Sequence, residues 1–202
     1  MAEIRALRAT DRDALYDICL RTGDAGKNAS GLYRDPELIG HVYAGAYAAL
    51  SPETCFVLED AAGVGGYILG TPDTRGFEAA CEEKWWPPLR ARHADPADTE
   101  TDPDARLRRL IHHPAKTPRR LADAYPAHLH IDLLPRLQRR GWGRKLIDTF
   151  RATMAARGVP ACHLGVGLAN ANAIRFYRAY GFSEVARFGL PHEVVFFGMA
   201  TM

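Results

Sequence analysis

The stretch from Ala127 to Phe150 constrains the fold more than any other part of this chain. Its first seven residues, AHLHIDL, alternate between apolar and polar side chains, which is the period of a β-strand. Pro135 ends that pattern, and apolar residues at helical spacing follow. Between them lies QRRGWG, in which Gly141 and Gly143 allow a sharp turn that gathers backbone N–H groups at the positive end of a helix. The stretch therefore predicts a site for an anion such as pyrophosphate.

Competing phosphate-binding motifs fit this stretch less well. A Walker A loop has four residues between its glycines, followed by Lys and then Ser or Thr, and neither feature is present. A Rossmann fingerprint needs a third glycine where Leu146 stands. An ordinary turn with a solvated basic rim is the remaining alternative. That rim would consist of Arg136, Arg139, Arg140, Arg144 and Lys145.

A second stretch, NANAIRFYRAYGF, runs from Asn170 to Phe182. Asn170 is a favourable N-cap, Gly181 follows the last helical residue, and an apolar residue comes directly after it. The pattern predicts a capped helix. Taken by itself, it leaves Tyr177 as either a core side chain or a functional one.

The two stretches resemble the two signatures of the GNAT acetyltransferase superfamily, Gln-x-x-Gly-x-Gly and Asn-x-x-Ala-x-x-Phe-Tyr-x-x-x-Gly-Phe. The resemblance implies an α/β (α+β) fold, with a central mixed, mostly antiparallel sheet flanked by helices and splayed between the two strands that hold the cofactor. The implied cofactor is acetyl-CoA, as co-substrate. A narrower resemblance, to bacterial relatives of the acetyltransferase-like C-terminal domain of O-GlcNAcase, depends on Tyr125, Pro126, His128, Leu129, Asp132, Phe176, Tyr177 and Phe182.

The resemblance also implies roles for individual residues. The implied cofactor-binding residues are Ile131, Asp132, Leu133, Leu134, Arg139, Arg140, Gly141, Trp142, Gly143, Arg144, Asn170 and Tyr177. Asn170 would bond the pantetheine arm, and the backbone N–H of Leu133 or Leu134 would polarise the thioester carbonyl. Tyr177 would protonate the departing thiolate. Asp132 would accept the proton of the attacking amine, or would bind the substrate's ammonium group.

The acceptor is expected to bind beside the loop from Thr22 to Ala29, which includes Asp24. In a GNAT fold such a loop, between the first two helices, borders the acceptor site. The amine acceptor itself is not identified by any motif.

Residues 71–125 are predicted to be an insertion into what is otherwise a single domain, residues 1–202. Within it, a helix from Glu78 to Trp86 should end at the two prolines that follow, because a residue before proline is disfavoured in a helix. Adjacent Trp85 and Trp86 are too apolar to remain in water, so they either anchor the insertion on the core or line an acceptor pocket. A short helix is expected around 105–111.

The other expected elements follow from local patterns. They are a strand over Ile4 to Arg8, a helix opened by a capping box of Thr10 and Asp13, one helix from Leu38 to Tyr47 with Asp35 as its N-cap, a hairpin of Thr54 to Glu59 with Val64 to Leu69, a strand over Ala161 to Leu168, and an apolar strand over Glu193 to Met199 that covers the sheet's far side.

Composition excludes several other classes. A net charge of +2 is too small to demand nucleic acid or an anionic membrane, and no run of eighteen apolar residues occurs. These features favour a cytoplasmic protein. The four cysteines are scattered, which predicts free buried thiols. His128, His130 and Asp132 share one strand face but span about 13 Å, too far to converge on one metal ion, so no metal is predicted.

The sequence therefore favours direct transfer of an acetyl group from acetyl-CoA to an amine. His130 is a second candidate for the base. The alternative function is a non-catalytic module that binds acetyl-CoA or a protein partner. GNAT domains often pair, so the resemblance also allows a homodimer.

Overall fold

A seven-stranded sheet forms the centre of the computed structural model, which describes residues 2–188 and 194–202. The strand order is β1-β2-β3-β4-β5-β7-β6, and each neighbouring pair is antiparallel except β4 and β5, which are parallel. The prediction of a mixed, mostly antiparallel sheet is confirmed. The strands are β1 (Glu3–Ala6), β2 (Phe56–Asp60), β3 (Gly63–Thr71), β4 (Ala127–Leu133), β5 (Ala161–Gly167), β6 (Ser183–Phe188) and β7 (Val194–Ala200).

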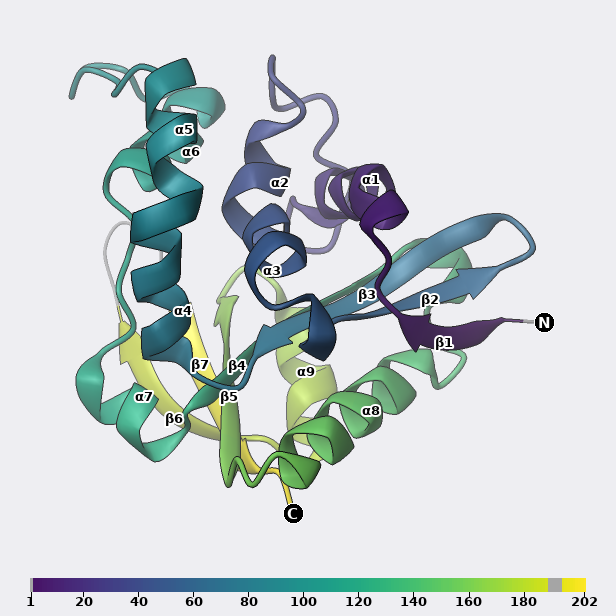
Figure 1. Cartoon of the computed structure of the whole chain (residues 1–202). Helices are drawn as coiled ribbons and strands as arrows, with labels where there is room; N and C mark the ends of the chain where they lie inside the picture. The colour runs from purple at the N-terminus through teal and green to yellow at the C-terminus, as the bar shows by residue number, and fades with distance from the viewer. Residues whose placement is uncertain (1, 189–193) are drawn as a thin grey trace.

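Helices cover both faces of the sheet (Figure 1). One face carries α1 (Arg12–Thr22), α2 (Leu38–Tyr43) and α3 (Gly45–Leu50), and the other carries α8 (Trp142–Ala156) and α9 (Ala171–Tyr180). A further column of helices stands beside α2 and α3, on the left in Figure 1. It comprises α4 (Thr74–Ala80), a π-helical turn (Cys81–Trp85), α5 (Trp86–Arg92) and α6 (Pro103–His112), and α7 (Arg119–Ala124) leads from it into β4. None of the described helices is long and apolar enough to cross a membrane.

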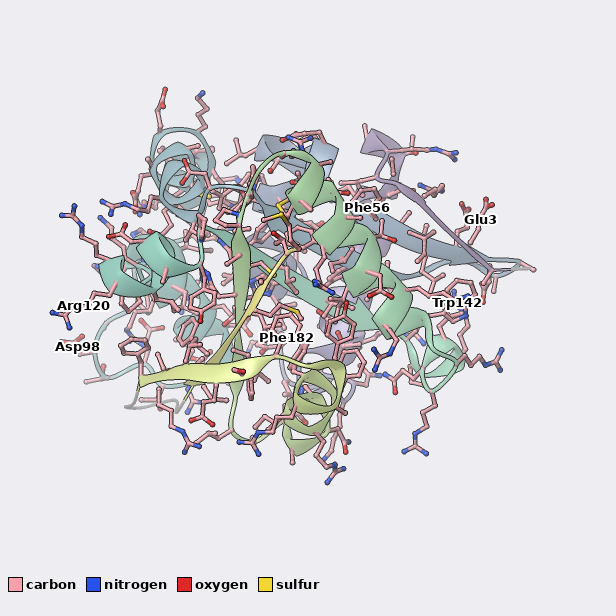
Figure 2. The ribbon with its side chains drawn as sticks, turned by 90° about the horizontal axis from the view of Figure 1, so that it is seen from below. Glu3, Phe56, Asp98, Arg120, Trp142 and Phe182 are labelled. Carbon is pink, nitrogen blue, oxygen red and sulfur yellow. The ribbon has the colours of Figure 1, made fainter. Side chains whose placement is uncertain are left out.

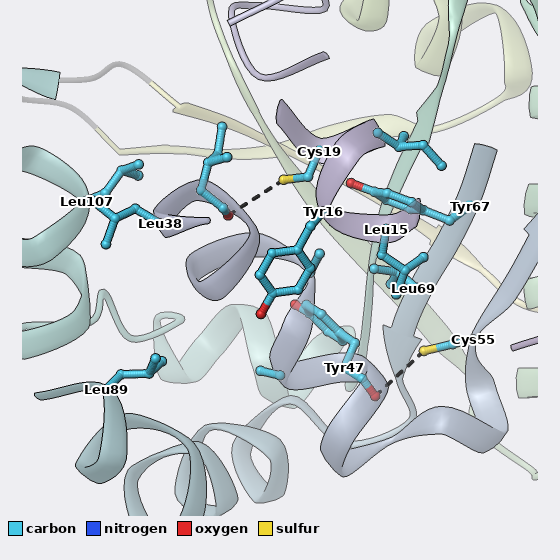
Figure 3. Close-up of a cluster of buried hydrophobic side chains, with 14 of the residues drawn as sticks. Leu15, Tyr16, Cys19, Leu38, Tyr47, Cys55, Tyr67, Leu69, Leu89 and Leu107 are labelled. Carbon is cyan, nitrogen blue, oxygen red and sulfur yellow. Dashed lines mark hydrogen bonds between the residues drawn. The ribbon is translucent and has the colours of Figure 1, made fainter. Parts of the chain in front are cut away.

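Two hydrophobic clusters fill the space on either side of the sheet, because successive strand residues point to opposite faces. The upper cluster lies between the sheet and α1 to α3, and the lower cluster lies between the sheet and α8 and α9. On β3, Tyr67 and Leu69 pack beneath α1 to α3, whereas Ile68 packs against α8. Figure 3 shows the first cluster, in which side chains of α1, α2 and α3 meet those of β3. The four cysteines are buried and free, as the sequence predicts.

The sheet opens between β4 and β5. The two strands pair only at their starts, with Ala127 opposite Cys162 and His128 opposite His163. Beyond these residues each strand continues without pairing to the other. The predicted splay between the two strands is confirmed.

The last strand does not cover the far side of the sheet, so that expectation was wrong. β7 lies inside the sheet, between β5 and β6. A run of apolar residues does not reveal which strands pair with it, so the composition of this segment could not distinguish these two positions. The expected start of this strand, Glu193, lies outside the described residues.

The two prolines after Trp86 do not end a helix. The Trp86 N–H donates to the carbonyl of Cys81, five residues back, and this wider π turn joins α4 to α5. Pro87 and Pro88 then occupy the first turn of α5. Their missing N–H groups cost little there, because the first amides of a helix have no partner within it. The helix expected around 105–111 is present as α6.

The helix expected from Leu38 to Tyr47 is broken at Ala44, where φ is −130°. Gly45 begins α3 against the hydroxyl of Tyr16 and the ring of Trp85, and any Cβ at this position would collide with both. These two aromatic side chains therefore require glycine directly after the break.

The expected capping box of Thr10 and Asp13 is absent: α1 has no side-chain cap from any described residue, and the capping contact lies in the 3-10 turn Ala9–Asp11 that precedes it. The carboxylate of Asp11 accepts the N–H of Arg8 at 2.8 Å and pairs with the guanidinium of Arg5 at 2.7 Å. Asp13 instead stays in solvent, paired with Arg12. Arg5, which pairs with Asp11, belongs to β1. Rules for helix caps consider only neighbouring residues, so they could not predict this contact.

Candidate active site

The loop between β4 and α8 presents an unbroken row of free backbone N–H groups. None of the six N–H groups from Arg139 to Arg144 donates to a described residue, and the next one, of Lys145, donates to the carbonyl of Gly141 at 3.2 Å. Arg139 and Gly141 adopt left-handed φ values of 58° and 78°. Alternation of left- and right-handed residues turns successive N–H groups to the same side, which is the geometry of an anion-binding nest at a helix N-terminus.

The basic side chains around this loop have different partners. Arg136 pairs with Asp60 at 3.1 Å and also donates to the carbonyl of Gly63, so it stabilises the β2–β3 hairpin. The ammonium group of Lys145 lies 4.5 Å from the ring centre of Trp142, the first residue of α8. Figure 2 shows Trp142 on the opposite side of the molecule from Asp98 and Arg120.

Three arginines complete the rim of the loop. The Arg144 guanidinium lies 4.9 Å from the ring centre of Tyr180. Arg139 and Arg140 are exposed and their side chains contact no described partner through hydrogen bonds or ion pairs. Only these two are therefore free to approach a ligand's phosphates without breaking an existing interaction.

The edge of β4 that faces the splay carries a free N–H group. The N–H of Leu134 donates to the carbonyl of Gly65 on β3 at 2.8 Å. Successive N–H groups of a strand point to opposite edges, so the N–H of Leu133 points toward β5, where the strands have separated. The Leu133 carbonyl on that edge accepts from Gln138 at 2.7 Å. Of the two residues expected to polarise a carbonyl, the geometry favours Leu133, because the amide of Leu134 is already engaged.

The side chain of Asp132 lies on the face of β4 that α1 covers. Its carboxylate accepts a hydrogen bond from the hydroxyl of Tyr67 at 2.7 Å and forms no salt bridge with any described residue. Burial raises the pKa of Asp132 to about 6, although the hydrogen bond opposes that rise. A carboxylate with this pKa is ionised at neutral pH and can still accept a proton.

The two histidines of the same face are poorer bases. The ring nitrogens of His128 are both engaged, by Tyr47 at 2.6 Å and Thr74 at 2.8 Å. Burial lowers the pKa of His130 to about 4, so it is neutral and weakly basic. The described residues contain no cluster of three side chains that could hold a metal ion. Asp132 is therefore the stronger candidate for the base.

Tyr177 projects from α9 into the lower cluster, where Phe182 and Phe197 pack against its ring. It is 7% exposed, and its hydroxyl has no hydrogen-bond partner among the described residues. Burial, reinforced by the charge of Asp132, raises the pKa of Tyr177 well above its ordinary value. The hydroxyl is therefore protonated at neutral pH and available as a donor.

The expected acceptor loop meets the start of α9. Asn170 caps that helix by accepting the N–H of Ala173 at 3.1 Å. A Cβ added at Gly26 would lie 3.5 Å from the side-chain nitrogen of Asn170, so the two segments touch. Asp24 is exposed and its backbone pairs with Lys27 in a tight turn. The structure thus brings the loop of the first two helices to the helix that carries the second signature.

Trp85 and Trp86 are anchors for the column of helices. Trp86 is 7% exposed within the upper cluster, and the Trp85 indole donates to the carbonyl of His41 on α2 at 2.9 Å. These contacts pack both side chains against α2 and α3, which supports the alternative that they anchor the insertion on the core. A place for them at the acceptor site stays a prediction. One residue that the sequence did not single out is Tyr67. The only signal for it was a tyrosine in an otherwise apolar strand, which requires a partner for its hydroxyl.

Comparison with known proteins agrees with this geometry. Residues 117–182 match the family model for the acetyltransferase (GNAT) family. A crystal structure of SsHAT is 41% identical, with a TM-score of 0.90, over 100% of this chain and 98% of that one. The chain belongs to the GNAT family. GNAT enzymes use acetyl-CoA as co-substrate.

More distant relatives share the GNAT fold. The structure of YncA from Salmonella typhimurium with its cofactor acetyl-CoA is 17% identical, with a TM-score of 0.55, over 100% of this chain and 94% of that one. Protein O-GlcNAcase of Rattus norvegicus is 26% identical over 198 residues. That match covers 96% of this chain but only 22% of the rat protein, so the chain spans about a fifth of this relative.

Proposed function

We propose that this protein transfers the acetyl group of acetyl-CoA directly to an amine. The observation that carries the proposal is the row of six N–H groups from Arg139 to Arg144 that have no acceptor among the described residues. A helix N-terminus leaves about four amides without a partner within the helix, whereas here the row extends back into the loop, and a diphosphate would satisfy several of these amides at once. The pyrophosphate of the cofactor would bind there, with the pantetheine arm running along the opening between β4 and β5 toward Asn170.

The reacting groups would meet at the splay. The thioester carbonyl oxygen would accept the N–H of Leu133, which stabilises the negative charge that develops when the amine nitrogen attacks the carbonyl carbon. The carbon–sulfur bond then breaks. Asp132 would take the proton lost by the amine, and Tyr177 would give its proton to the departing thiolate. Each proton would finally exchange with water, so both side chains return to their starting states.

The amine must be uncharged to attack, and the position of Asp132 suits this requirement. A carboxylate with no arginine or lysine partner retains its full attraction for an incoming ammonium group and can then take its proton. The loop from Thr22 to Ala29 would border the entering acceptor.

Calorimetry with acetyl-CoA, followed by a thiol-release screen over primary amines, amino sugars and peptides, tests the proposal. We expect binding, and release that depends on one class of acceptor. Asp132→Asn should reduce release by at least tenfold and leave acetyl-CoA affinity within twofold. Asp13→Asn, which changes a fully exposed carboxylate on α1, is the matched control and should alter neither. Binding without any release would instead support the non-catalytic module, and equal release by both variants would remove Asp132 from the mechanism.

A further inference from the structure

Tyr67 and Asp132 are direct partners across two strands. They face each other in the register of β3 and β4, and both side chains lie on the face covered by α1. The Tyr67 side chain is fully buried, and its hydroxyl donates to Oδ2 of Asp132 at 2.7 Å. Figure 3 shows the Tyr67 ring among the side chains of the upper cluster, beside Cys19 of α1. Its ring is therefore held by packing, and the hydroxyl has a fixed position.

Apart from Tyr67, no described residue places a strong donor or a charge at Asp132. Cys19 and Thr22 face it from α1, and His130 precedes it on the same face of β4. Tyr177 of α9 is near enough for the charge of Asp132 to raise its pKa. All four are neutral at pH 7. The Thr22 hydroxyl also donates to the carbonyl of Ile18 at 2.7 Å, so it is shared. The hydrogen bond from Tyr67 is consequently the main interaction that favours the ionised form of this carboxylate.

We propose that Tyr67 is a positioning residue for acetyl transfer, which fixes the carboxylate of Asp132 and keeps it ionised so that Oδ1 can accept the proton of the amine. The assignment rests on the proposed function of Asp132 as the base. Two opposing effects act on the ionisation of the Asp132 carboxyl. Burial favours the protonated carboxyl, whereas a hydrogen bond donated to the carboxylate favours the ionised form.

A purely structural role for Tyr67 would have a different signature. If Asp132 served only to satisfy the buried hydroxyl, removing that hydroxyl would change the stability of the fold and leave the pH dependence of transfer unaltered. If Tyr67 controls the ionisation of Asp132, removal of the Tyr67 hydroxyl must shift the pH at which Asp132 titrates. The decisive measurement is therefore a pH titration of Asp132 itself, which does not require a known acceptor.

Carbon-13 NMR of the Asp132 carboxyl group provides that titration. We expect the midpoint to rise by about one pH unit in Tyr67→Phe, since a hydrogen bond to a charged group contributes roughly that much. Tyr47→Phe is the matched control, because Tyr47 is also buried on this face but its hydroxyl bonds to His128. Its Asp132 midpoint should equal that of the unaltered protein. Equal midpoints in all three proteins would overturn the proposal.

A second measurement covers the case in which Tyr67→Phe does not fold. In the unaltered protein, the Tyr67 ring carbon that bears the hydroxyl should titrate with the same midpoint as the Asp132 carboxyl, because both report one shared proton arrangement. Independent midpoints would contradict the proposal. This measurement requires no substitution.

The kinetic consequence separates this proposal from the proposed function. With an acceptor found by the screen, Tyr67→Phe should lose on the order of fivefold in kcat/KM at pH 6 and almost nothing at pH 9, where Asp132 is ionised in both proteins. A loss that is the same at every pH would contradict the role of Tyr67. If Asp132→Asn transfers acetyl groups normally, the base assignment fails instead, and the NMR midpoints still decide whether Tyr67 controls Asp132.

Discussion

Gly141→Ala is the substitution that most sharply tests the anion-binding loop. Gly141 has φ of 78°, and no atom lies within 4 Å of the position that a Cβ would take. The structure provides a matched control at the other end of α8, because Gly158 has φ of 72° and the same open surroundings. The two alanine variants therefore introduce the same backbone strain at opposite ends of one helix.

The stability cost should be nearly equal in the two variants. A left-handed conformation costs a non-glycine residue about 1 kcal/mol or slightly more. For a chain of 202 residues this corresponds to a fall in Tm of about 3 °C. Differential scanning calorimetry should find this decrease in both.

The affinity for acetyl-CoA should differ between them. At Gly141 the strained residue belongs to the loop that carries the free N–H groups, so relaxation of its φ turns N–H groups from Arg139 to Arg144 out of their shared orientation. Loss of even one hydrogen bond to a charged phosphate costs about 1.5 kcal/mol or more, which weakens binding at least tenfold. At Gly158 the methyl group is remote, so affinity should remain unchanged. Equal affinities in isothermal titration calorimetry, with equal losses of Tm, would refute the assignment of the loop.

Three other results are expected. Tyr177→Phe should lower turnover at least tenfold with acetyl-CoA affinity nearly intact, as measured by thiol release and calorimetry; normal turnover would exclude Tyr177 as the acid. Because burial raises the pKa of Asp132 from an ordinary 3.8 to about 6, the carboxylate destabilises the fold above that pH, and stability from this group is present below pH 3.8 and lost as the pH rises through 6. Asp132→Asn should therefore stabilise the protein by about 3 kcal/mol at pH 7, and by much less at pH 4, in urea denaturation. A variant that is less stable than the unaltered protein at pH 7 would contradict the sign. Trp86→Ala should lower the free energy of unfolding by about 3 kcal/mol or more, because it removes a side chain of α5 that is buried in the upper cluster. A loss below 1 kcal/mol in urea denaturation would show that Trp86 does not anchor the column of helices.

The parts of the fold that could be predicted from sequence are those with local causes. The strand from Ala127, the turn at Gly141 and the capped helix after Asn170 each depend on residues within a few positions of one another. Alternation, left-handed glycine and N-capping are properties of short segments, and the structure contains all three. The two signature stretches were therefore predictable together with the opening of the sheet that the family resemblance implied.

The incorrect expectations have long-range causes. Tyr16 and Trp85 require glycine beside the break at Ala44, and Asp11 pairs with Arg5 from another element. The position of β7 depends on strand pairing, which composition does not encode. At the candidate site the same limit applies. Asp132 could be selected from its place on the strand, whereas its partner Tyr67 comes from a strand more than sixty residues earlier and is joined to it only by sheet register.

The central claim is that the N–H groups from Arg139 to Arg144 bind the diphosphate of acetyl-CoA. Nitrogen-15 NMR measures it directly, with S-acetylpantetheine, which lacks the diphosphate, as the control ligand. We expect acetyl-CoA to shift these six amide signals strongly and the control ligand to leave them in place, while both ligands shift the amide of Leu133. Saturating acetyl-CoA that leaves all six signals unmoved would contradict the account.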